Sequence, residues 1–482
     1  MAAGDASLPP PDPGNSIRPF TPEQAKEIVM SLQKPAVFCN MTFDWPVLHW
    51  SVSYLANLFK GKRIRFRIGK KDMGTAPLFE TECSYVEATL EEFLAWSGRQ
   101  PSCSCGPFKA YDLHKYWTYA DYKYIAQLFE DKPEHFQDVV WSDFGFEGRN
   151  GRDSTLWIGS RGANTPCHLD SYGCNLVLQV QGRKRWYLYP PEDSSFLYPT
   201  RLPYEESSVF SKVNVVSPDL RSYPQFKKAQ AHVMTLEPGQ VLFVPRHWWH
   251  YVESIDPITV SVNSWIEMDA DHEARVEEAI TRTLICAVKS IENPAASEAW
   301  LNPTEAEITS HETNLKFLNG AVSAYLENKK TRISGFQDAE GIIQDSCKKR
   351  KIQVNPDPRD IRVKPYESHL TGIKTKNVGE IPFGPNLLQV LPQSQKTCAT
   401  EIVEHTSHCL FSGNDGCFGK LHPAGNTFGK DSDSRAFPDQ KDTNLSADSS
   451  KTVISTNDLL DCVLHPHVVS LMAHLLLERA SI

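Results

Sequence analysis

Three side chains that commonly bind transition metals stand in two separated stretches of the 482-residue chain. His168 and Asp170 lie two residues apart, and His250 ends the run Val244–His250. Residues i and i+2 of a β-strand share a face, so His168 and Asp170 can reach one ion, and His250 offers a third ligand. Two histidines and one carboxylate leave positions open for a bidentate cosubstrate and for oxygen, as in non-haem iron(II) oxygenases. A His-x-Asp pair alone is more often structural, so its neighbours decide the interpretation.

A lysine follows the metal-binding segment on the second of two predicted strands, which cover 175–180 and 183–188. By parity, Lys184 shares a face with Trp186 and Leu188. If that face lines the barrel interior, a buried ammonium is costly unless an anion neutralises it, and the distal carboxylate of 2-oxoglutarate is such an anion. The alternative is that Lys184 extends to the rim, with its stem packed and its ammonium in water.

The segments around these residues resemble those of the JmjC oxygenases, in particular the hydroxylase branch that includes the asparaginyl hydroxylase acting on hypoxia-inducible factor. The matching segments lie in family order across residues 124–288, and together they are far more specific than any single motif. They are Thr165–Asp170, Gln179–Arg185, Leu197–Pro199, Pro238–Pro245, Trp248–His250 and Val262–Trp265.

The resemblance implies a set of binding roles. His168, Asp170 and His250 would bind Fe(II), and Lys184 with Thr165 would hold the distal carboxylate of 2-oxoglutarate. Polar groups that line the same pocket in the family correspond to Asn175 and Asn263. A family tyrosine that touches the cosubstrate falls in the aromatic cluster Trp117–Tyr124, and we assign it to Tyr119.

Two functions remain open from these patterns. The favoured one is an Fe(II)- and 2-oxoglutarate-dependent dioxygenase that hydroxylates a C–H bond of a protein side chain, in which the protein supplies positioning and water exclusion. The alternative is a non-catalytic JmjC-fold binding module or regulator. Segments outside the barrel, such as Phe38–Met41, resemble those of JmjC proteins that are associated with small heat-shock proteins. The resemblance implies a small heat-shock protein as partner, a role in the stress response, and a cytoplasmic location with a nuclear fraction. A chromatin demethylase is less favoured, because the sequence shows no zinc-ligand clusters or basic patches.

Composition narrows the class of partner and the compartment. The formal net charge is −9 and the isoelectric point is near 6.0, without a long run of Lys or Arg, so direct nucleic-acid binding is disfavoured. The 12 cysteines are irregularly spaced, and no basic region leads into an apolar run near Met1, which argues against disulfides and a secretory signal. No window reaches the roughly 18 apolar residues of a membrane span. We therefore expect a protein of a reducing compartment without a membrane segment.

Other potential ligands are interpreted as structural. Cys103 and Cys105 are too close together for a zinc knuckle, and the His and Cys residues of 405–422 lack a surrounding fold signal. Cys167 should point away from the metal by strand alternation, and His247 should pack at the barrel mouth.

The fold class expected is α+β and mainly β, with a double-stranded β-helix (jelly-roll, cupin-like) core, because short apolar runs with turn residues between them fill 141–265. Thr21 with Pro22 and the box Thr89–Glu92 predict helices before it, and Arg63–Ile68 alternates as a half-buried strand. The predicted parts are a disordered N-terminus (1–18), an α/β extension (19–123), the JmjC barrel (124–288), a helical appendage (289–330), a low-complexity linker (331–453) and a C-terminal amphipathic helix (454–482).

The packing of the C-terminal part stays open at the level of sequence. Val276, Ile280, Leu284 and Val288 recur every fourth residue, which predicts an amphipathic helix. The helices behind the barrel can pack on the core of their own chain, on a partner, or on a second copy in a homodimer through the C-terminal helices.

Overall fold

The structure is a computed structural model, and it describes residues 17–72, 74–101, 104–290, 300–305, 308–341, 381–393 and 455–481. Residues 1–16 of the predicted disordered N-terminus and most of the predicted linker lie outside these ranges, whereas Arg18, at the end of that predicted segment, is described and forms an ion pair with Asp44. The chain divides into two compact units, residues 1–393 with 460–482, and residues 394–459. Except for the first turn of one C-terminal helix, the elements below belong to the first unit.

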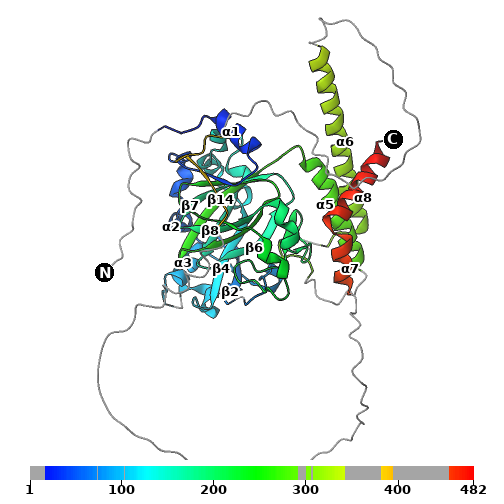
Figure 1. Cartoon of the computed structure of the whole chain (residues 1–482). Coiled ribbons are helices and arrows are strands. Elements are labelled where there is room, and N and C mark those ends of the chain that lie inside the picture. The colour runs from blue at the N-terminus through cyan, green and yellow to red at the C-terminus, as the bar shows by residue number, and fades with distance from the viewer. Residues whose placement is uncertain are drawn as a thin grey trace, which may run out of the picture. The chain divides into compact units, whose positions relative to one another are not determined.

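Two antiparallel sheets form the core (Figure 1). The nine-stranded sheet has the order β15 (Leu387–Gln389), β1 (Ala36–Phe38), β12 (Val241–Val244), β7 (Cys174–Gln181), β14 (Ile258–Ile266), β5 (Thr155–Ser160), β4 (Tyr116–Tyr124), β2 (Ile64–Lys70) and β3 (Ser84–Ala88). The six-stranded sheet has the order β11 (His232–Leu236), β8 (Lys184–Tyr189), β13 (Trp249–Ser254), β6 (Asn164–Asp170), β10 (Ser208–Ser211) and β9 (Pro199–Thr200). The mainly β, jelly-roll core with added helices confirms the predicted fold class.

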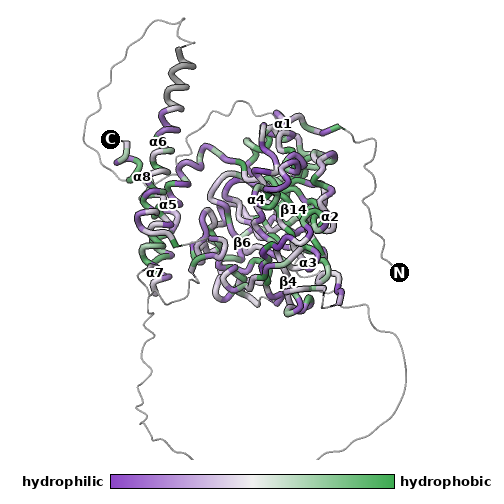
Figure 2. Tube along the Cα trace, turned by 180° about the vertical axis from the view of Figure 1, so that it is seen from behind, coloured by the Kyte–Doolittle hydropathy of each residue, from purple (hydrophilic) through white to green (hydrophobic). Residues whose placement is uncertain are grey.

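Strand β7 shows why the barrel strands are nearly continuous apolar runs. Leu176 and Leu178 pack into the large core cluster that also contains the N-terminal helices. Val177, which points the other way, packs with Trp186 and Leu188 in a second cluster between the sheets. Because both faces of this strand are buried, apolar residues are required at successive positions. Figure 2 shows the hydrophobic colour of β14, its neighbour in the sheet.

The N-terminal helices begin where their capping residues predict. In α1 (Pro22–Ser31) the Thr21 hydroxyl accepts a hydrogen bond from the Gln24 backbone N–H, and the Gln24 side chain accepts one from Thr21. The box at α3 (Leu90–Ser97) joins Thr89 and Glu92 in the same way. The remaining helices are α2 (Val52–Leu58), α4 (Ile125–Leu128), α5 (Asp271–Lys289), α6 (His311–Gly341), α7 (Thr456–Val463) and α8 (Pro466–Ala480). Short 3-10 helices lie at Pro46–His49, Glu80–Glu82, Gly106–Ala110, Pro133–Asp138, Trp141–Phe144, Gly151–Asp153, Pro191–Phe196 and Pro224–Lys228.

Strand β2 departs from the predicted half-buried alternation. Arg67, expected on the polar face, is completely buried, as are its neighbours Phe66 and Ile68. Its Nε donates to Asp121 Oδ2 at 2.7 Å, and its Nη2 donates to the Asn164 carbonyl at 2.9 Å. The strand lies between β3 and β4 rather than at a solvated edge, and the arginine is tolerated there because charged and polar partners surround it.

A second departure lies within the range predicted as a linker. The described residues 381–393 include β15, which pairs with β1 at the edge of the nine-stranded sheet. Leu387 is fully buried there. A three-residue strand carries too little periodic signal for sequence-based recognition, and here it is defined by its pairing partner.

The C-terminal helices pack on one another, and α5, α6 and α8 gather on one side of the barrel (Figure 1). Val276 and Ile280 of α5 contact Val469, Ala473 and Leu477 of α8. The helical layer therefore starts at α5, which the sequence placed largely in the barrel domain. The C-terminal helix is interrupted before Pro466, near the predicted position.

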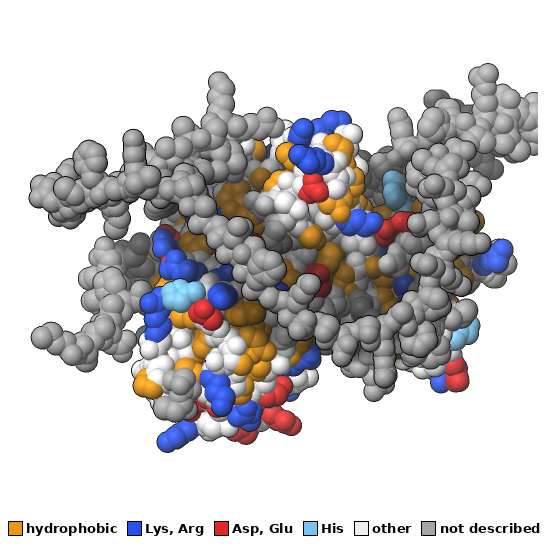
Figure 3. Space-filling view, turned by 90° about the horizontal axis from the view of Figure 1, so that it is seen from below, with side chains coloured by type: hydrophobic (Ala, Val, Ile, Leu, Met, Phe, Trp, Pro, Cys, Tyr) orange, Lys and Arg blue, Asp and Glu red, His pale blue; other side chains and the backbone are white. Residues whose placement is uncertain are grey.

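The surface combines apolar and charged groups. On the face shown in Figure 3, side chains of both charge signs are interspersed with hydrophobic ones. Within the described ranges, no single helix has the length and apolar composition of a membrane span, while α7 and α8, bent by 56° at their break, meet both criteria only as a pair.

Candidate metal centre

The three predicted metal ligands converge between two neighbouring strands. His168 on β6 is paired directly with His250 on β13, and their ring centroids are 4.2 Å apart. Asp170 follows on the same face of β6, with Oδ1 3.7 Å from His168 Nε2 and Oδ2 3.9 Å from His250 Nε2. One ligand atom from each residue lies within 4.8 Å of the other two. Such spacing allows all three residues to bind one ion.

Hydrogen bonds orient the three ligands. His168 Nδ1 lies 2.9 Å from the Pro166 carbonyl oxygen, and His250 Nδ1 lies 3.0 Å from the Trp248 carbonyl oxygen. A carbonyl can only accept, so Nδ1 must carry the proton and Nε2 presents its lone pair to the metal position. Trp265 Nε1 donates to Asp170 Oδ2 at 3.0 Å. Burial and the facing His250 lower the pKa of His168 to about 4, so this ring is neutral at physiological pH.

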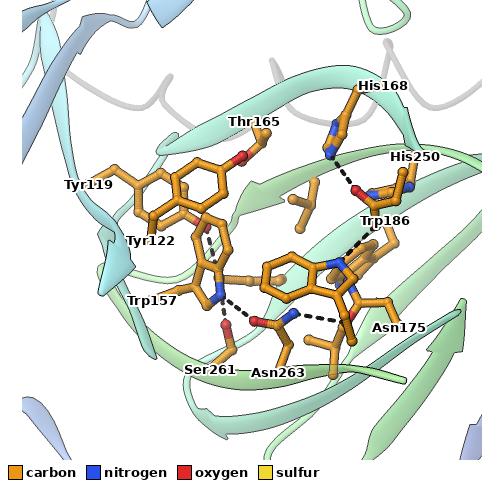
Figure 4. A pocket seen from close by; sticks show the side chains of 15 residues that line it. Tyr119, Tyr122, Trp157, Thr165, His168, Asn175, Trp186, His250, Ser261 and Asn263 are labelled. Carbon is orange, nitrogen blue, oxygen red and sulfur yellow. Dashed lines mark hydrogen bonds and ion pairs between the residues drawn. The ribbon is translucent and has the colours of Figure 1, made fainter. Parts of the chain in front are cut away.

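A pocket with about 430 Å³ of empty space, its mouth included, extends from the ligands between the two sheets. Figure 4 shows Tyr119, Tyr122 and Trp157 grouped on one side of it, and His168 and His250 on the other. Within the described part of the chain, the trio is the one cluster of three or more potential ligands that could hold a metal. Two imidazoles and a carboxylate fit a ferrous ion in donor type and number.

Lys184 lies fully buried on β8 and lines the same pocket. Its ammonium donates to Ser261 Oγ at 2.7 Å and to Tyr119 Oη at 3.1 Å. Burial lowers the pKa of Lys184 to about 7, although the negative charge of Asp121 acts in the opposite direction. Among the described residues, no carboxylate forms an ion pair with it, so the site lacks an anion that the charged ammonium requires. Thr165 also lines the pocket and is hydrogen-bonded to Tyr119.

The two predicted asparagines form a second hydrogen-bonded group. Asn263 Nδ2 donates to Asn175 Oδ1 at 2.9 Å, and Trp157 Nε1 donates to Asn263 Oδ1 at 2.7 Å. Because an indole N–H can only donate, it sets the orientation of the Asn263 amide. Asn175 and Asn263 come from the adjacent strands β7 and β14, and both line the pocket.

Sequence reasoning missed four polar or aromatic lining residues, besides Val177 and Val252. Ser261 and Trp265 lie two positions either side of Asn263 on β14, so strand parity could have identified both once Asn263 was placed inward. Trp157 stands opposite Ser261 on β5. Tyr122 has no such signal, because the strand that carries it is irregular.

Among the residues interpreted as structural, those that the structure describes are not part of the ligand trio. Cys167 packs with Tyr251 and Leu197, and burial raises the pKa of its thiol. His247 is in the left-handed region with a φ of 64° and is not part of the ligand trio. Cys105 contacts the Gln100 carbonyl. Cys103 and the His and Cys residues of 405–422 lie outside the described residues.

The two facing sheets, with a clustered His, Asp, His trio whose histidines are buried, define a cupin-like domain of the JmjC type. A family model described as a cupin-like domain matches residues 22–272. The chain therefore belongs to the cupin-like JmjC family, and within it to the group of the HSPB1-associated proteins, which it matches over its whole length.

Individual relatives support both levels of this assignment. HSPB1-associated protein 1 of Homo sapiens is 54% identical over 492 residues, covering 100% of both chains. The HSPB1-associated protein 1 homolog of Danio rerio is 50% identical over 474 residues, covering 96% of this chain and 98% of its own. Lysine-specific demethylase 8 of Xenopus tropicalis is 30% identical over 240 residues, which is 48% of each chain.

Proposed function

We propose that this protein is an Fe(II)- and 2-oxoglutarate-dependent oxygenase that hydroxylates a protein side chain. The observation that carries the proposal is the buried ammonium of Lys184 in the pocket that also holds the metal ligands. A structural metal site has no need of a cation that is desolvated and lacks an ion-pair partner. A dicarboxylate cosubstrate explains both features, because one end binds the metal while the other neutralises the ammonium.

The side chains of the pocket divide the binding between them. Lys184, Tyr119, Thr165 and Ser261 supply hydrogen-bond donors for the distal carboxylate at the buried end. When bound, iron and 2-oxoglutarate supply the oxidising chemistry, in which 2-oxoglutarate becomes succinate and carbon dioxide as a C–H bond is hydroxylated. The aromatic walls exclude water from the reacting groups.

Succinate formation from 2-oxoglutarate by the iron-loaded full chain tests the proposal. Lys184→Met and Asp170→Ala should abolish it, the first through the cosubstrate and the second through the metal. Arg185→Met is a matched control, since Arg185 is the next residue of β8 and is exposed. A folded, iron-loaded wild type that never consumes 2-oxoglutarate would contradict the proposal.

A second candidate function is a binding module for small heat-shock proteins. It is favoured by the name HSPB1-associated protein 1, which relatives with 54% identity over the whole chain carry. Capture of a purified small heat-shock protein by wild type and by His168→Ala separates the two functions. Equal capture by both, without succinate formation by the wild type, would favour the module.

The location and assembly follow as further proposals. A small heat-shock partner would place the protein in the cytoplasm, with a nuclear fraction, which imaging of the tagged chain would test. A homodimer through the C-terminal helices would cover Leu471 and Leu475, which are exposed on α8. Sedimentation of wild type and of Leu471→Glu would test this assembly.

A further inference from the structure

Tyr122 owes its place in the pocket wall to an irregularity of β4. Ala120 pairs with Ile158 and Lys123 with Leu156, so Asp121 and Tyr122 together face the single residue Trp157. This is a β-bulge, which redirects the side chains of the strand. Tyr122 adopts a φ of 50°, a left-handed conformation that is unfavourable for a tyrosine and that the surrounding contacts must maintain.

Tyr122 is more exposed to solvent than the predicted cosubstrate residues Tyr119 and Lys184. Tyr119 and Lys184 are almost completely buried, with 2% of each exposed. Tyr122 and Trp157 line the same pocket but are only half-buried, as is Asp170 at the metal position. A substrate side chain that enters the pocket from solvent therefore has these half-buried residues within its reach.

The Tyr122 ring is held from two sides. It lies 4.6 Å from the Trp157 ring, between centroids. Its hydroxyl is hydrogen-bonded to the carboxyl group of Glu205, in the connection between β9 and β10. Trp157 in turn donates to Asn263, so a displacement of Tyr122 would also disturb the asparagine pair.

Glu205 is anchored by the segment that leads into α6. Asn302 Nδ2 donates to its carboxylate, and both residues are buried. The Asn302 backbone N–H donates to the Tyr204 carbonyl at 2.8 Å, which fastens the two segments side by side. Burying a carboxyl group without hydrogen-bond partners is energetically costly. Glu205 is buried with Asn302 and Tyr122 as partners, and it therefore contacts a residue of the pocket directly.

We propose that Tyr122 is a specificity-determining residue for the substrate side chain, and that Glu205 and Asn302 are positioning residues that hold it. This inference rests on the proposed oxygenase function for its specificity part. The positioning part concerns the protein alone and is independent of turnover.

The positioning part is tested by ¹⁹F NMR of the full chain labelled with 5-fluorotryptophan. The Trp157 signal, assigned with Trp157→Phe, should shift or broaden in Glu205→Ala. It should return to the wild-type position in Glu205→Gln, whose amide oxygen still accepts from the Tyr122 hydroxyl. Glu206→Ala is the matched control, because Glu206 is the next residue and is exposed. A Trp157 signal that is identical in Glu205→Ala and wild type would overturn the positioning role.

The specificity part is tested with a peptide library that carries each amino acid at a central position. We measure preference as the ratio of kcat/KM for the best central residue to that for the second best. This ratio should fall at least about fivefold in Tyr122→Phe and in Glu205→Ala, through a change in KM rather than in kcat. The preference is a ratio measured within each variant, so a uniform loss of turnover, which succinate formation without peptide measures separately, cancels from it. An unchanged preference in both variants would overturn the specificity role. Absence of succinate from the wild type would instead refute the oxygenase proposal and the specificity part with it, while the NMR result would stand.

Discussion

The affinity for 2-oxoglutarate should fall as the pH rises through neutrality. The pKa of Lys184 in the free protein is about 7, because burial disfavours its charged form. The carboxylates of 2-oxoglutarate stay ionised above pH ~6, whereas the free lysine becomes neutral above pH ~7 and must take up a proton to bind the anion. Between pH ~6.5 and pH ~8.5 the charged fraction falls from about 0.76 to about 0.03, so the Kd should rise about 25-fold, or about 2 kcal/mol.

Isothermal titration calorimetry with manganese as a redox-inert metal measures this dependence. The proton uptake should appear as a binding enthalpy that varies with the ionisation enthalpy of the buffer at pH ~8 and does not vary at pH ~6. Lys184→Arg keeps a permanent cation, so its Kd should change little over the same range. A wild-type Kd that is flat or decreases with pH would refute the assignment of this ammonium to the cosubstrate.

Three substitutions test other contacts of the site and the fold. Ser261→Ala removes one of two hydroxyl partners of the buried ammonium and should weaken 2-oxoglutarate binding about tenfold in the same calorimeter. Trp265→Phe leaves Asp170 without its indole donor and should weaken manganese binding about 10- to 100-fold, with unchanged thermal stability as the check on folding. In the native protein, Arg201 Nη1 donates to Glu278 Oε2 at 3.0 Å. Arg201→Ala leaves the buried Glu278 carboxylate without this ion-pair partner, so the free energy of unfolding measured in urea titrations should fall by about 3–5 kcal/mol. Replacing both members of that pair by Met and Leu should cost less, and an equal cost would argue that volume rather than charge is responsible.

The candidate site was predictable where it depends on local strand geometry. His168 and Asp170 share a face because side chains alternate along a strand, and Lys184 points inward with Trp186 by the same parity. The capping residues of α1 and α3 act within one helical turn, so they too could be recognised in the sequence. The jelly-roll class followed from apolar runs and turn residues, which are local signals repeated along the chain.

Other features depend on which distant segments meet, and only the tertiary structure decided them. Arg67 is buried because Asp121, 54 residues away, accepts its hydrogen bond. Leu387 belongs to a strand because β1 lies beside it, and Tyr122 reaches the pocket because a bulge breaks the parity of β4. A single sequence states which faces are apolar but not which partner each face will meet. The free energy of a buried charge or a strained residue is set by those partners, so these features become visible only in the folded chain.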